Sequence, residues 1–384
     1  MNGVIAKADL ITLISKIQNI VSTKPAIPIL SNVLIEAFDD QIILSATDLT
    51  TSMRCYASAK VIEEGAIALP ARRFFQLIRE LTSPQVKITS SSNENAQIIS
   101  GSSLFKLNGM HKNEFPTLPD TSGATQLTLA PKALKDLLSK TAFSAAREDS
   151  RYVLNGILLQ IQNSKATFIG TDGKRLAKTA YEVEVDESFQ GSYILPLKAV
   201  EEMIRMLDHS EETAILGLMH DKVFLEHSNH VLITKLMAGQ YPDVERVIPE
   251  SLPGPIALHR EELITLLRQV SLFTSDMSHS VRFLFENGQL NLNAASSDIG
   301  EGNVSMPVDY QGKKLEIAFN PYYFQDILRH SKDETVNFSI QDSYNPGVIT
   351  DSSDVLFVIM PMRLNEGYRG EKQDEPDTEK VALT

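Results

Sequence analysis

The chain has 384 residues, of which 42% are hydrophobic and 22% are charged, with a formal net charge of −13. This length exceeds one compact core and predicts two or three domains. The single cysteine, Cys55, excludes an intramolecular disulfide and argues against a thiolate zinc site. The amino terminus lacks the apolar core of a signal peptide, and no apolar run reaches the roughly 18–20 residues that span a membrane. We therefore expect a cytoplasmic protein without a membrane partner.

The predicted elements, taken along the chain, alternate between amphipathic helices and short strands. The first is a helix over 7–20, in which apolar residues recur at steps of three and four. Two alternating strands, 32–38 and 41–48, follow and are separated by a turn at the aspartates 39–40. A second helix over 71–80 precedes further short strands. Helices that bury one stripe need a sheet to cover them, which predicts an α+β domain.

The same order of elements occurs three times. The Leu-Pro pairs at 69–70 and 195–196 are 126 residues apart, Asp48 and Asp172 are 124 apart, and Phe319 begins a third copy of the second helix. Such pairs are also common in loops, but the shared order of elements favours repeats of about 120 residues. Each repeat would hold two helices on antiparallel strands. The later helices are predicted at 131–140, 197–208, 260–268 and 321–332.

Segments rich in glycine, proline and serine near residues 122 and 252 mark the boundaries between the repeats. We predict three domains, at 1–122, 123–251 and 252–364. The last segment, 365–384, carries six acids and three bases and has little to bury. It is predicted to be a disordered acidic tail.

The positive charge is concentrated in the predicted helices. They hold 14 basic and 9 acidic residues, a net charge of +5 in a chain whose total is −13. Lysine and arginine are good helix formers on solvated surfaces, which would explain any one helix. The same excess across several helices favours a shared basic face suited to duplex phosphates. No pattern for reading bases accompanies it, so binding would be independent of sequence.

The stretch "GTDGKRLA" at 170–177 is open to three interpretations: a phosphate loop, part of a metal site or a tight turn. It lacks the longer glycine-rich run and the Gly-Lys-Ser/Thr ending of a P-loop. No G-x-S-x-G elbow is present elsewhere, and the histidines lack the spacing of zinc ligands. A tight turn after a strand is therefore favoured, and we expect neither catalysis nor a cofactor.

Eight segments in register carry a family resemblance: "KPAIPILSNVLIEA", "LPARRFFQLIREL", "FPTLP", "RYVLNGILLQ", "GTDGKRLA", "YPDVERVIP", "FNPYYFQDIL" and "VIMPMRL". Across residues 1–364 the chain resembles the bacterial DNA polymerase III β subunits, the sliding clamps. The resemblance implies three clamp domains per chain and a head-to-tail homodimeric ring around double-stranded DNA. It also implies the clamp loader complex, the DNA polymerase III α subunit and other polymerases or repair proteins as partners.

The resemblance further implies a hydrophobic cleft for clamp-binding peptides between the second and third domains. The matching positions are Arg151, Leu154, Thr171, Gly173, Lys174, Arg175, Leu176, Pro242, Arg246, Val247, Asn320, Tyr323, Val358, Met360, Pro361, Met362, Arg363 and Leu364. Two departures stand out. The family often has histidine where Lys174 stands, and here about twenty residues follow Leu364.

Two further groups of residues follow from the resemblance. The DNA-facing candidates are Lys24, Arg72, Arg73, Arg79, Arg147, Lys174 and Arg205, with ordinary surface charges as the competing interpretation of each. Leu272 and Phe273 are dimer-interface candidates, with a role in the core as the alternative. The alternative function is a three-repeat scaffold that binds proteins but not DNA.

Overall fold

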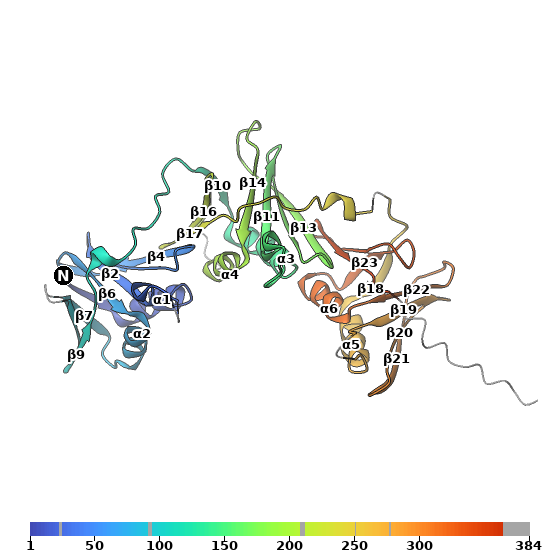
Figure 1. Cartoon of the computed structure of the whole chain (residues 1–384), viewed down its shortest axis with the longest axis horizontal. Helices are drawn as coiled ribbons and strands as arrows, with labels where there is room; N and C mark the ends of the chain where they lie inside the picture. Colours follow the sequence, from blue (N-terminus) through green and yellow to red (C-terminus); the bar gives the residue numbers. More distant parts are fainter. Residues whose placement is uncertain (23–24, 91–93, 208–211, 250, 276–277, 364–384) are drawn as a thin grey trace, which may run out of the picture. The chain divides into compact units, whose positions relative to one another are not determined.

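The computed structural model describes residues 1–22, 25–90, 94–207, 212–249, 251–275 and 278–363 (Figure 1). The chain forms two compact units. Unit 1 contains Met1–Arg246 and Thr350–Val358, and unit 2 contains Val247–Ile349 and the chain from Ile359 onward. The predicted boundaries near residues 122 and 251 remain predictions.

The first repeat, within unit 1, begins with a strand and an amphipathic helix. The aspartates 39 and 40 have φ angles of 45° and 55°, so the predicted turn between the first two repeat strands is confirmed as a tight hairpin. The elements are β1 (Asn2–Ala6), α1 (Lys7–Ile17), β2 (Asn32–Phe38), β3 (Gln41–Thr47), β4 (Thr51–Ser58), β5 (Lys60–Glu63), β6 (Gly65–Pro70), α2 (Ala71–Glu80), β7 (Gln85–Ser90), β8 (Asn95–Ser100) and β9 (Ser103–Asn108).

The second repeat completes unit 1 and shares a sheet with the first. Its elements are β10 (Thr125–Leu129), α3 (Pro131–Ala142), β11 (Gly156–Gln162), β12 (Lys165–Thr171), β13 (Arg175–Glu182), β14 (Gly191–Pro196), α4 (Leu197–Met206), β15 (Ala214–Leu218), β16 (Lys222–His227) and β17 (His230–Lys235). One sheet has the order β10-β15-β16-β17-β4-β3-β2-β6, and β17 pairs antiparallel with β4. A second runs β14-β11-β12-β13-β25, where β25 is Val355–Ile359, and a third β5-β1-β7-β8-β9.

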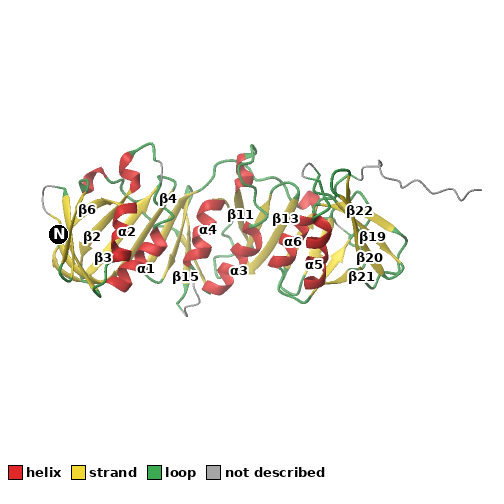
Figure 2. Cartoon of the chain, turned by 90° about the horizontal axis from the view of Figure 1, so that it is seen from below, coloured by secondary structure: helices red, strands yellow, loops and turns green. Residues whose placement is uncertain are grey.

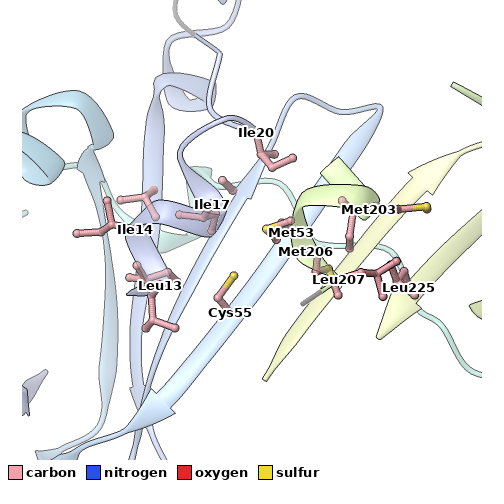
Figure 3. Close-up of a cluster of buried hydrophobic side chains, with 14 of the residues drawn as sticks. Leu13, Ile14, Ile17, Ile20, Met53, Cys55, Met203, Met206, Leu207 and Leu225 are labelled. Atoms are coloured by element: carbon pink, nitrogen blue, oxygen red, sulfur yellow. The ribbon is translucent and has the colours of Figure 1, made fainter. Parts of the chain in front are cut away.

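The core of unit 1 lies between its helices and these sheets. Figure 2 shows α1 to α4 side by side on one face of the unit, with the strands behind them. Met53 and Cys55 of β4 lie between side chains of α1, such as Ile17, and Met203 and Met206 of α4 (Figure 3). All five are at most 1% exposed. Because burying such a side chain contributes about 1.5–3 kcal/mol, the two repeats stabilise each other.

Cys55 provides a test of this shared core. Burial raises the pKa of its thiol to about 12, and the thiolate is the reactive form. The folded chain should therefore leave a thiol reagent such as Ellman's reagent unreacted at pH 8, whereas the chain in urea should release one equivalent of chromophore. Equal rates for the folded and unfolded chain would contradict the buried position.

Unit 2 contains the third repeat. Its elements are β18 (Ile256–His259), α5 (Arg260–Ser271), β19 (Val281–Glu286), β20 (Gln289–Ser296), β21 (Gly300–Pro307), β22 (Leu315–Phe319), α6 (Pro321–His330), β23 (Thr335–Ser339) and β24 (Gly347–Thr350). The strands form the orders β21-β20-β19-β22 and β24-β23-β18. Phe283 and Phe324 stack with ring centroids 5.0 Å apart and pack with Phe319 in its core. All six predicted helices are confirmed in the described residues, with ends that shift by up to three residues.

Each repeat closes in the same way, through a methionine that follows its last strand. Met110 forms an isolated β-bridge with Ala68, and Met362 forms one with Ala318. In the second repeat, the backbone N–H of Met237 donates to the carbonyl of Ile194 at 2.9 Å. In each repeat, the methionine contacts the strand that precedes the second helix of that repeat. The predicted threefold repetition therefore includes this methionine contact, which no sequence motif indicated. Met362, a predicted peptide contact, therefore also anchors its own repeat.

Candidate functional site

The stretch "GTDGKRLA" forms the tight turn that links β12 and β13. The N–H of Gly173 donates to Thr171 Oγ1 at 3.0 Å, and those of Lys174 and Arg175 donate to Asp172 Oδ1 at 2.9 and 3.0 Å. Because local side chains already accept from these three amides, the turn cannot use them to hold a phosphate. Of the three interpretations, the structure supports the tight turn.

Gly173 is required at this turn for two reasons. Its φ of +82° lies in the region that residues with a Cβ atom disfavour, and a Cβ there would lie 2.7 Å from Arg151 Nη1. The guanidinium of Arg151 donates to the carbonyl of Asp172 at 2.9 Å. The turn is therefore closely fitted to Arg151.

Asp149, which no sequence motif indicated, orients Arg151. Arg151 donates to Asp149 from Nε at 3.1 Å and from Nη2 at 2.9 Å, a bidentate pair. These hydrogen bonds from Arg151 lower the pKa of Asp149 from 3.8 to about 2, so the carboxylate stays ionised in more acidic solution than an ordinary aspartate does. Asn155 donates to the backbone carbonyl of Asp149 at 2.9 Å and so fixes the loop that carries both residues.

Arg175 has internal partners, unlike its neighbour Lys174. Its side chain is only 11% exposed, and Nε lies 3.1 Å from Asp172 Oδ2. Its guanidinium also donates to the carbonyl of Phe143 at 2.9 Å and lies 5.3 Å from the centroid of that ring. Lys174 is exposed. Among the two bases of the turn, Lys174 is thus the one that presents charge to solvent.

The other predicted peptide-binding residues fall into buried and exposed groups, described separately for each unit. In unit 1, four of them are buried: Leu154, Thr171, Leu176 and Val358. Pro242 and Arg246 are exposed. In unit 2 the exposed members are Val247, Met360 and Arg363, and the half-buried ones are Asn320, Tyr323, Pro361 and Met362. Asn320 also caps α6, because its Oδ1 accepts from the N–H of Tyr322 at 3.0 Å. Leu364 lies outside the described residues.

The predicted DNA-facing bases differ in whether neighbouring side chains pair with them. Arg72 and Arg73 of α2 are exposed, and neither forms an ion pair within the part of the chain that the structure describes. Arg147 pairs with Glu201, Arg205 pairs with Glu202, and Arg79 donates to Gln18. Lys24 lies outside the described residues. Arg72, Arg73 and Lys174 therefore present the least neutralised charge among these candidates.

Part of the basic excess in the helices serves the fold. In each repeat, a base of the first helix donates to carbonyls at the end of the second. Lys7 reaches the carbonyl of Arg79 at 3.2 Å, Lys135 that of Leu207 at 2.9 Å, and Arg260 that of Leu328 at 3.4 Å. Cations at a helix C-terminus are stabilising. The net charge of the helices is therefore larger than the positive charge that is available to a ligand.

Exposed apolar side chains occur at an edge of each unit. In unit 2, Leu272 directly after α5 is 72% exposed, which excludes the core as its place in the isolated chain. Phe273 is half-buried against Gly302. In unit 1, Leu104 and Phe105 of the edge strand β9 are 55% and 37% exposed. Sequence reasoning missed this pair, although "SLFKLN" departs from the alternation of a half-buried strand.

Two classes of site find no support in the described residues. No cluster of three or more histidine, cysteine, aspartate or glutamate side chains is arranged to hold a metal ion among the residues that the structure describes. Within the same residues, each helix is too short or too polar to cross a bilayer.

Repeats of two helices on antiparallel sheets, with exposed bases on the helices, define a DNA-clamp type of protein. Three family models match the chain: the N-terminal domain of the DNA polymerase III beta subunit over residues 1–119, the central domain over 128–243 and the C-terminal domain over 245–363. The chain belongs to the DNA polymerase III beta subunit family, and the family resemblance and α+β fold are confirmed.

Individual relatives agree with this assignment. The chain is 53% identical to the beta sliding clamp of Chlamydia pneumoniae over 366 residues, which are 95% of this chain and 100% of that one. It is similar to the solved Pseudomonas aeruginosa DnaN sliding clamp bound to griselimycin, with a TM-score of 0.91 and 27% identity over 95% of this chain and 100% of the other. A non-catalytic clamp is consistent with these names, whereas the alternative scaffold that does not bind DNA has no support among them.

Proposed function

We propose that two copies of this chain close head to tail into a ring that encircles duplex DNA without sequence specificity. The ring acts in the cytoplasm and tethers the DNA polymerase III α subunit, other polymerases, repair proteins and the clamp loader complex. The observation that carries this proposal is the match of three successive beta-subunit domains over nearly the whole described chain.

A surface of unit 1 favours a contact with a second copy. A pocket of about 520 Å³ lies over α2 and β9, and its lining includes Leu77, Leu104, Phe105 and Leu107. Exposed strand edges with apolar side chains tend to pair with another chain. Leu272, which is 72% exposed in unit 2, has the size and apolar character to fill this pocket in a partner copy. Heterologous contacts of this kind form closed rings when the rotation permits.

Peptide binding is the second part of the proposal. In unit 1, the turn at 171–175 stands on the rigid network of Asp149, Arg151 and Asp172. We infer that the buried Leu176 and Val358 form the apolar base beneath this surface, and that the exposed Lys174 and Arg151 supply charge for the peptide backbone or its acids. The contributions of Asn320, Tyr323, Met360, Pro361 and Met362 in unit 2 remain predictions.

DNA binding by the helix face is tested by removing its freest bases. The double variant Arg72→Ala/Arg73→Ala should weaken binding to duplex DNA and make it less dependent on salt. Each lost phosphate contact reduces the slope of log K against log [salt] by about 0.9. The matched control is Lys60→Ala/Lys165→Ala, which removes two exposed bases from strands. Equal slopes for the two double variants would contradict a DNA-binding surface on the helices.

A further inference from the structure

A second pocket of unit 1, about 720 Å³ in volume, lies on the other face of the sheet from the helices. Ile157, Leu159 and Ile161 of β11 point into the core that the helices cover. Leu158 and Gln160 alternate with them and therefore point to the opposite face, where they line the pocket. Ser192 and Ile194 of β14, His220 and Asp221 of the β15–β16 turn and the segment 236–245 complete the lining. Of the predicted peptide contacts, the lining includes only Pro242.

The floor of this pocket is apolar. Leu158, Ile194 and Met237 are 8%, 5% and 7% exposed, because the segment 236–245 covers them in part. Tyr241 of the same segment donates from its hydroxyl to the carbonyl of Gly156 at 3.4 Å, which holds the cover in place. The pocket is therefore a fixed hollow with room for an apolar side chain.

One wall of the pocket is an incomplete strand edge. β14 is the outermost strand of its sheet, and the carbonyl of Ile194 accepts from Met237 at 2.9 Å, so the backbone of Ile194 faces away from β11. Backbone groups alternate along an antiparallel strand, so those of Ser192 face outward as well. Ser192 is exposed and lines the pocket, and no partner for its outward backbone groups is found in the described part of the chain.

The rim of the pocket is acidic. Besides Tyr241, its ionisable residues are His220, Asp221, Asp243 and Glu245, with no lysine or arginine among the lining residues. Arg246 pairs with Asp243 at 2.8 Å, and Lys178 pairs with Glu245. Asp221 is exposed, lines the pocket together with residues of β14, and has no ion pair among the described residues. A cation on a ligand would find its complement at Asp221.

We propose that this pocket binds a short extended peptide that adds as a strand to the outer edge of β14. One apolar side chain of the peptide packs on Leu158 and Ile194, and a lysine or arginine two positions away, on the same face of the added strand, pairs with Asp221. Main-chain hydrogen bonds to Ser192 supply affinity, and the floor and Asp221 supply selectivity. The proposal does not depend on the proposed clamp function, and the pocket lining includes neither Leu176 nor Val358.

Three fluorescently labelled nine-residue peptides, rich in threonine, test the proposal by anisotropy with the full chain. The first carries leucine and lysine two positions apart, the second glutamate in place of lysine, and the third asparagine in place of leucine. We expect saturable binding of the first peptide and at least about tenfold weaker binding of the other two. Asp221→Lys and Ser192→Trp should each abolish binding of the first peptide, because they reverse the charge and fill the exposed end of the pocket.

Glu184→Lys is the matched control, since it makes the same change of charge at an exposed position outside the pocket lining. It should leave the affinity within about twofold of the original. Absence of saturable binding of the first peptide, equal binding of the three peptides, or unchanged binding by both pocket variants would each overturn the proposal. Binding of a clamp-binding peptide to the surface around the turn at 171–175, measured on the same variants, should be unaffected, which separates a failure of this site from a failure of the proposed clamp surface.

Discussion

Replacement of Leu272 with aspartate should convert a dimer of about twice 42.6 kDa into a monomer. A head-to-tail ring closes through two equivalent contacts, so each dimer would lose two buried leucines. Burial of one leucine contributes about 1.5–3 kcal/mol. Two such losses should raise the dissociation constant of the dimer at least about 100-fold. Burial of the two introduced carboxylates would raise it further. The measurement is solution mass by light scattering over a range of protein concentrations.

The matched control for this experiment is Leu252→Asp. Leu252 is 41% exposed but lies outside the proposed contact, so this variant should remain dimeric. The Leu272 variant should also lose the difference between circular and linear DNA in retention assays after loading, because an open ring can leave either. A dimer of unchanged affinity, or an original chain that is monomeric at micromolar concentration, would disprove the proposed ring.

The second large effect is expected at Gly173. Gly173→Ala should weaken the binding of a clamp-binding peptide at least about tenfold, because a Cβ 2.7 Å from Arg151 Nη1 forces either the turn or the arginine to move. The same change imposes strain at a φ of +82°, which costs about 1–2 kcal/mol of stability. The measurements are isothermal calorimetry with the clamp-binding peptide and thermal unfolding of the free chain.

Gly123→Ala is a control that separates the effect of backbone strain from the effect of the steric clash. Gly123 has a φ of +77°, but nothing lies within 4 Å of the position that its Cβ would take. This control should be destabilised by backbone strain alone and should bind the clamp-binding peptide as the original chain does. If Gly173→Ala also bound normally despite a similar loss of stability, the turn would not form part of the ligand site.

The sequence predicted the fold well where the signal was local or repeated. The six helices follow from apolar residues at steps of three and four, and α2 begins and ends where its pattern does, at Ala71 and Glu80. The threefold repeat could be recognised because each copy keeps its turn chemistry at nearly constant spacing, as at Asp48 and Asp172. Helix ends were less well predicted. The predicted segment 321–332 ends as a helix at His330, because Ser331 adopts an extended backbone.

The candidate site was predicted in part. The turn at Gly173 was expected as a tight turn, because glycine and aspartate favour one, but the sequence did not indicate its dependence on Asp149 and Arg151. Arg175 and Lys174 are adjacent bases that the sequence alone does not distinguish. In the structure, Arg175, and not Lys174, contacts the ring and carbonyl of Phe143, which lies 32 positions earlier. Contacts between residues far apart in the chain carry no local pattern, so they could not be inferred from composition or spacing.

What the sequence determined by itself is the three-repeat α+β architecture and the family, because periodicity, turn residues and motif order are properties of the chain. Only the tertiary structure decided which charged and apolar groups remain available to a partner. In the folded chain, Lys7, Lys135 and Arg260 donate hydrogen bonds to carbonyls at helix ends. Arg72, Arg73, Leu104 and Leu272 remain exposed. The physical reason is that a side chain's availability depends on whether folding brings a complementary group within about 3–4 Å, and such proximity arises only when distant segments pack.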